Sequence, residues 1–246
     1  SIIEVKNNTL AYFQAQSRAV TKEDYITRIY ALPAKYGNVA KAYIVQDTQL
    51  DNKTGANSDN RIINPLALNL YTLGFNANKK LVNLNQAVKE NIQTYLTQFR
   101  MVTDAVNIKD AYVINIGVKF NLLTKTGYNK DEVVLRAIQT VKDFFDIDNW
   151  QIGQPIVLAD LAYQISLVDG VSAVVTPEED NDDKNPIIIT NKFLESDNYS
   201  GNVYDVKGAT KNGVVYPSLD PSIFELKFPN IDIEGRVIGD STGGAY

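Results

Sequence analysis

The sequence predicts an α+β fold with two consecutive small α+β units that have mixed sheets, followed by a β-rich, loop-rich C-terminal region. One observation is the unbroken apolar alternation from Tyr112 to Leu122, which is typical of a central strand. Helical periodicity appears on both sides of it, and past Pro177 the composition becomes rich in Gly, Asn, Tyr and Pro. The expected division is residues 1–104, 105–177 and 178–246.

The first expected helix begins in the segment "SRAVTKEDYITRIYALP", residues 17–33. Thr21 can cap a helix that begins at Lys22, because its side chain can accept from the amide of the third helical residue. Asp24 occupies that position and can bond back to the cap amide, which completes a capping box. We expect Pro33 to close this helix.

The rest of the first unit is expected to contain two strands and a helix. Residues 39–46 alternate as a half-buried strand, and the polar run 51–60 is typical of a long loop. A second strand places Leu66, Leu68 and Leu70 on one face. Asn83 or Asn85 then caps a helix with an apolar stripe, formed by Val88, Ile92, Tyr95, Leu96 and Phe99.

The second unit is expected to read strand, helix, short strand, helix, strand. The strand 111–123 comes first, and Asn129 caps the helix that follows. The core face of that helix is Val134, Ala137, Ile138, Val141, Phe144 and Phe145. After the short strand and turn "WQIGQP", a helix with Leu158, Leu161, Ala162 and Ile165 precedes Gly170, a left-handed cap, and the strand 171–175.

The C-terminal region is expected to expose apolar strands. After the acidic loop "EEDNDDKN", Phe224, Leu226 and Phe228 alternate on one face, and Ile231 and Ile233 continue the pattern. No helix of their own is visible to cover these strands, so they need an external surface. These five residues are the candidate interface.

Composition excludes several classes of function. The 246 residues include no Cys and no His, which removes disulfides, thiolate nucleophiles and the usual neutral-pH general base. With 24 basic and 29 acidic residues, nucleic acid is an unexpected partner. No apolar run approaches the roughly 20 residues that cross a bilayer, so no membrane partner is expected. The chain begins at Ser1 without a signal peptide, and we expect a soluble fragment of a longer protein.

Three patterns resemble sites but have plainer interpretations. Residues 239–243 match the G-x-S-x-G nucleophile elbow, yet no histidine is present, and a flexible tail is favoured. The run 178–183 lacks the glycine and glutamate of a calcium loop. Glu225, Asp232 and Glu234 are expected to lie on the outward face of amphipathic strands. We therefore expect no catalytic residue, metal site or cofactor.

Two alternative functions remain open. Tyrosines and Asn- and Asp-rich loops are typical of a carbohydrate-binding or adhesive module. A glycosidase that works without histidine is the third possibility, since paired carboxylates suffice for that chemistry.

The segment Arg18-Ala19-Val20-Thr21, then Glu23-Asp24-Tyr25, then Pro33 and the strand "VAKAYIV", resembles the R-A-V-T-x-E-D-Y segment of the baseplate J-like family of contractile phage tails. The strand 112–122, the helix from Lys130, and the segments "IGQPIVLADLAYQI" and "VDGVSAV" are similar to that family's C-terminal α+β unit, in the same order. The resemblance covers roughly residues 17–176. The Asn- and Tyr-rich tail looks most like the wedge subunits of T-even type phages, with this chain as their C-terminal part.

The resemblance implies a structural protein rather than an enzyme. Such a protein would form homodimers, join with neighbouring wedge proteins into a ring around the central hub, and rearrange when the tail contracts. It implies a location in the virion tail baseplate, and in the host cytoplasm during assembly. Arg18, Thr21, Asp24 and Tyr25 would then specify the fold and would not form a binding site.

Overall fold

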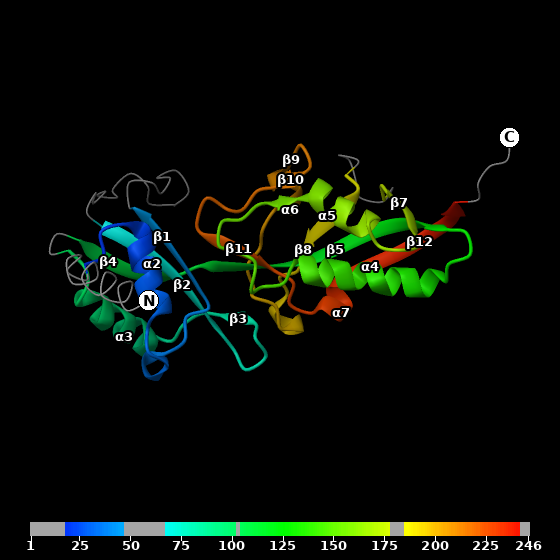
Figure 1. The fold of residues 1–246 in the computed structure, drawn as a ribbon. Coiled ribbons are helices and arrows are strands. Elements are labelled where there is room, and N and C mark those ends of the chain that lie inside the picture. Colours follow the sequence, from blue (N-terminus) through cyan, green and yellow to red (C-terminus); the bar gives the residue numbers. More distant parts are fainter. Residues whose placement is uncertain (1–17, 47–66, 102–103, 178–184, 242–246) are drawn as a thin grey trace, which may run out of the picture. The chain divides into compact units, whose positions relative to one another are not determined.

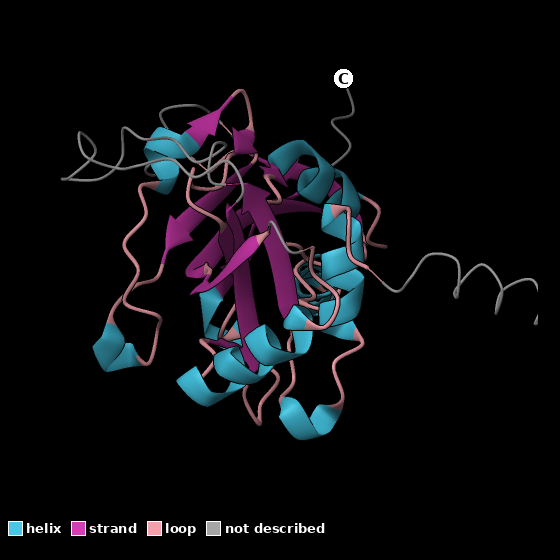
Figure 2. Cartoon of the chain, turned by 90° about the vertical axis from the view of Figure 1, so that its left-hand side faces the viewer, coloured by secondary structure: helices cyan, strands magenta, loops and turns pink. Residues whose placement is uncertain are grey.

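The computed structural model describes residues 18–46, 67–101, 104–177 and 185–241. Contacts divide the chain into two compact units, Ser1–Ala111 and Tyr112–Tyr246 (Figure 1). Both units contain helices and strands (Figure 2), which confirms the predicted α+β class. Two units stand where the sequence led us to expect three parts.

The first unit has a four-stranded mixed sheet centred on β2 (Ala67–Phe75). β1 (Lys41–Gln46) and the short β3 (Leu81–Val82) pair with β2 antiparallel, whereas β4 (Ala105–Asp110) pairs with it in parallel. The predicted loop 51–60 and Leu66 lie outside the described residues.

Among the described residues of the first unit, the helices are α2 (Lys22–Tyr30) and α3 (Gln86–Thr97), with a 3-10 turn η1 at Ala34–Tyr36. The predicted capping box at Thr21 is present, and Asn85 caps α3 through a bond from the Val88 amide. The helices and sheet share one core, formed by Ala19, Tyr25, Ile29, Ala42, Ile44, Leu70, Ile92, Leu96 and Val106.

The second unit is organised around β5 (Tyr112–Lys125), the long strand that the alternation predicts. β11 (Ser222–Glu225) and β12 (Ile233–Ser241) follow one another in parallel along one edge of β5. β8 (Ile187–Asn191) and β7 (Val171–Val175) follow one another antiparallel along its other edge. Chain segments more than 100 residues apart thus meet on one strand.

Helices α4 (Lys130–Phe144) and α5 (Leu158–Ser166) pack against each other and on this sheet. Asn129 caps α4 as predicted, and Gly170 has a positive φ directly before β7. A small sheet joins β6 (Ile156–Val157), β10 (Val214–Val215) and β9 (Thr210–Lys211). Short helical turns in the described part of this unit are η4 (Glu195–Asp197), α6 (Val206–Ala209) and α7 (Pro229–Asp232).

The C-terminal strands are not uncovered, contrary to the expectation from the sequence. β11 and β12 belong to the main sheet of the second unit, and α4 packs on β12. Ile231 lies in the turn α7 rather than in a strand. The elbow-like residues Gly239–Ser241 also belong to β12, so the flexible-tail interpretation is wrong for them, whereas 242–243 lie outside the described residues, as does 178–184.

Candidate interaction surfaces

Thr21 and Asp24 form a closed local hydrogen-bond ring at the start of α2. The Asp24 amide donates to Thr21 Oγ1 at 3.1 Å, and the amides of Thr21 and Val20 donate to Asp24 Oδ2 at 2.9 and 3.0 Å. These bonds from backbone amides hold the pKa of Asp24 below its usual range. Both side chains are therefore engaged with their own backbone.

The other motif residues anchor this helix to the core or face solvent. Tyr25 is buried, and its hydroxyl donates to Asp104 Oδ2 at 2.7 Å. Burial and this bond raise the pKa of Tyr25 to about 12. The Ala19 amide donates to the Phe99 carbonyl at 2.8 Å, while Arg18 is exposed. Thr21, Asp24 and Tyr25 are thus engaged within the first unit, and the fold-specifying role of the motif stays a prediction.

The five candidate interface residues separate into two groups. Phe224, Leu226 and Ile233 are at most 6% exposed, so they pack inside the second unit. Phe228 is half-buried, and Ile231 is 69% exposed. Only the last two are thus placed to contact a partner.

A buried polar cluster holds β11 and the loop after η4 against β5. Asn115 Nδ2 donates to Glu225 Oε2 at 2.9 Å, and Asn115 Oδ1 accepts from the Ser200 amide at 2.8 Å. Ser200 Oγ and Asn202 Nδ2 both donate to the Val113 carbonyl at 2.8 Å. Glu225 is 2% exposed, so the expected outward orientation of this carboxylate is wrong.

Asp232 is also buried rather than outward. It accepts from the Phe228 amide at 2.7 Å and from the Tyr199 hydroxyl. Burial and the bond to Asp232 raise the pKa of Tyr199. The Tyr199 ring stands edge-on to Phe228, with centroids 5.4 Å apart. Of the three sequence-adjacent acids, only Glu234 reaches the surface, where it pairs with Lys119 at 3.1 Å.

An apolar groove opens between the turn α7 and the segment after β8. Its volume is about 600 Å³, and its lining includes Phe193, Leu194, Tyr199, Phe228 and Ile231. Phe193 and Leu194 are 40% and 53% exposed. Sequence reasoning missed these two residues, although two adjacent large apolar residues before the polar run "ESDN" could have indicated them. Exposed apolar side chains gathered in this way are typical of a protein-binding surface.

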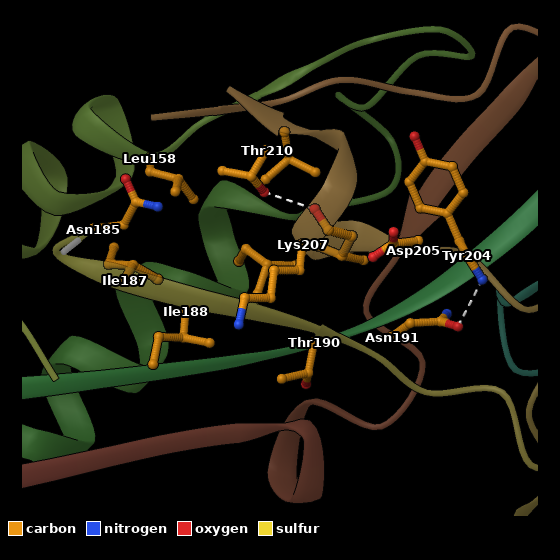
Figure 3. Close-up of a pocket in the computed structure, with 13 residues that line it drawn as sticks. Leu158, Asn185, Ile187, Ile188, Thr190, Asn191, Tyr204, Asp205, Lys207 and Thr210 are labelled. Carbon is orange, nitrogen blue, oxygen red and sulfur yellow. Dashed lines mark hydrogen bonds between the residues drawn. The ribbon is translucent and has the colours of Figure 1, made fainter. Parts of the chain in front are cut away.

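A second cavity, of about 330 Å³, lies beside β8 (Figure 3). Leu158 and Ile187 contribute apolar surface, and Asn185, Asp205 and Lys207 contribute polar groups. Two hydrogen bonds fix its wall, from Thr210 Oγ1 to the Val206 carbonyl at 2.7 Å and from the Tyr204 amide to Asn191 Oδ1 at 2.9 Å. Its chemistry is mixed and does not single out a reaction.

A third hollow, of about 410 Å³, lies over β5, β8 and β12. Lys119, Asn121, Glu234, Arg236 and Ile238 are among its lining residues. Register places Glu234 beside Lys119 and Arg236 beside Asn121, so these four side chains share one face of the sheet. We call it the open face.

The two buried acids of the second unit are held by separate partners. Glu225 and Asp232 line none of these three hollows, and each is bonded to a different partner. Among the residues placed by the structure, no group of three or more His, Cys, Asp or Glu is arranged to hold a metal ion. The same residues include no helix that is long and apolar enough to cross a membrane.

No family model matches the sequence, and no curated protein matches it. A chain in the cryo-EM structure of the anti-feeding prophage (AFP) baseplate, 6-fold symmetrised, is similar in structure, with a TM-score of 0.52 and 10% identity. The match covers 92% of this chain and 42% of that chain, so this chain spans less than half the length of its structural neighbour. At this identity the similarity is one of fold.

Proposed function

We propose that this protein is a structural component of a contractile-tail baseplate and works by association rather than by catalysis. The observation that carries the proposal is the fold shared with a baseplate chain over 92% of the length of this chain. The resemblance of its R-A-V-T-x-E-D-Y segment to baseplate J-like proteins points in the same direction and comes from the sequence alone. Its location would be the virion tail.

The surface of the second unit supports a role in association. The groove of Phe193, Leu194, Tyr199, Phe228 and Ile231 offers apolar area to a neighbouring protein. The two buried acids have structural partners, which weakens the glycosidase alternative. The proposal also includes a place for this protein in the baseplate wedge, dimers of the same chain, and a ring of these dimers around the hub.

The test is to delete the encoding gene from the genome that carries it and to image the resulting tail particles by electron microscopy. We expect tails without a complete baseplate, and restoration when an intact copy of the gene is supplied. Particles with intact baseplates after deletion would overturn the proposal.

Self-association has a separate test in solution. Light scattering on the purified chain should give the mass of a dimer at high micromolar concentration. A monomer at that concentration would contradict the dimer and leave the baseplate role to the deletion experiment.

A further inference from the structure

One edge of the main sheet in the second unit has no partner strand within the described residues. β12 pairs in parallel with β5 on its inner side, and no described strand pairs with its outer side. None of residues 234–239 is buried, as expected of an edge strand. Such an edge presents backbone donors and acceptors that can pair with another strand.

The charges on this edge are complementary to themselves under a two-fold rotation. Glu234 and Arg236 flank Gly235 and lie on the open face. In an antiparallel pair of two β12 strands centred on Gly235, Glu234 of one copy lies opposite Arg236 of the other, twice. The side chains on the other face match as well, since Ile233 would lie opposite Val237.

The geometry points to β12 as a dimer edge, occupied by β12 of a second copy in antiparallel register about Gly235. The regular stretch 233–237 on each copy would extend two five-stranded sheets into one continuous sheet. The register shift between Val237 and Gly239 ends the regular stretch and sets its length. This inference rests on the proposed self-association and names its surface.

Two neighbouring features favour this occupant. Arg236 is exposed and forms no ion pair within the residues that the structure describes, whereas Glu234 already faces Lys119 at 3.1 Å. A carboxylate between Lys119 and the partner's Arg236 would be better neutralised than in the single chain. Val134 and Ile138 are half-buried on α4, the helix that packs on β12, and can flank the added strand.

Charge reversal tests the pairing. Arg236→Glu leaves the Lys119–Glu234 pair intact but places two carboxylates opposite each other at both symmetric positions. We expect the dimer dissociation constant, measured by sedimentation, to rise on the order of tenfold. Lys211→Glu on β9 is the matched control, since it makes the same charge change at another exposed strand residue and should leave the constant unchanged.

Cross-linking tests the register. The chain has no native cysteine, so Glu234→Cys and Arg236→Cys variants each carry one thiol. Oxidation of either variant alone should give little cross-link, because 234 does not face 234 in this register. A mixture of the two should cross-link, since position 234 faces 236 at a distance that a disulfide spans and the second Glu–Arg pair remains intact.

The outcomes separate the two proposals. The edge pairing is supported if Arg236→Glu weakens the dimer and if the cross-link forms only in the mixture of the two cysteine variants. Dimers that tolerate Arg236→Glu, or that never cross-link in the mixture, overturn the edge pairing and leave self-association through another surface. A wild-type monomer at high micromolar concentration overturns both, and the charges would then serve to protect the edge from association.

Discussion

The Tyr25 hydroxyl donates a 2.7 Å hydrogen bond to Asp104 Oδ2 across 79 positions of sequence. Tyr25 belongs to α2, and Asp104 immediately precedes β4, so one bond links the helix to the parallel edge of the first sheet. The tyrosine ring is 1% exposed and is part of the core of this unit.

Tyr25→Phe should therefore destabilise the first unit without emptying its core. The ring remains, but a hydrogen bond to a carboxylate is lost, which costs about 2 kcal/mol. Chemical denaturation followed by circular dichroism would measure the change. Tyr43→Phe, at an exposed position on β1, is the control and should shift stability by less than about 0.5 kcal/mol. Equal effects of the two variants would contradict the assigned role.

The same tyrosine should make stability fall with pH in the alkaline range. Burial and the bond to Asp104 raise the pKa of Tyr25 to about 12 from an ordinary value of 10.0. As the pH rises, the unfolded chain releases this proton before the folded chain does. The contribution of Tyr25 to the free energy of unfolding is therefore complete below pH 10 and is lost between pH 10 and about 12. Denaturation curves between pH 9 and 12 should show a shallower decline for Tyr25→Phe than for wild type; parallel declines would contradict this assignment.

The capping box gives a third prediction. Thr21→Ala removes the acceptor for the Asp24 amide and should cost about 1 kcal/mol. Thr27→Ala, an exposed position within α2, makes the same chemical change without touching the cap and should be neutral or slightly stabilising. Thermal melts of the two variants provide the comparison. A loss at Thr27 as large as that at Thr21 would mean that the cap is not the cause.

The second unit distinguishes Phe224 from Ile231, although both were candidate interface residues. Phe224 is 1% exposed and lies on β11 beside Ile114, so Phe224→Ala should cost about 3–5 kcal/mol. Ile231 is 69% exposed, and Ile231→Ala should change stability by less than about 0.5 kcal/mol. Urea denaturation of both variants tests this contrast, and a stable Phe224 variant would remove β11 from the core.

Asn115 should stabilise the attachment of β11 and of the loop at Ser200 to β5. Asn115→Ala removes the donor to Glu225 and the acceptor for the Ser200 amide, at a cost of about 3 kcal/mol. Asn121→Ala, on the open face of the same strand, is the control and should have little effect. Hydrogen exchange should show faster exchange of the Ser200 amide in the first variant; an unchanged rate would contradict the bond.

The elements that depend on neighbouring residues could be predicted from the sequence. Thr21, Asn85 and Asn129 cap helices where expected, because a cap is made within four residues of chain. β5 was equally predictable, since its alternation persists over more than ten residues. Of the five candidate interface residues, Phe228 and Ile231 line the groove beside α7, and their role in an interface stays a prediction.

The partners of the C-terminal strands were decided by the tertiary structure alone. Alternation in the sequence of β11 and β12 predicts one buried face, but it does not reveal that β5, over 100 residues earlier, supplies the burial. Glu225 and Asp232 look like surface acids in a local pattern, and only the donors brought by Asn115 and Tyr199 make their burial favourable. The sequence by itself determined the helix starts, the central strand and the absence of thiol and imidazole chemistry. Which apolar faces remain for a partner depends on long-range pairing, which no local window of residues contains.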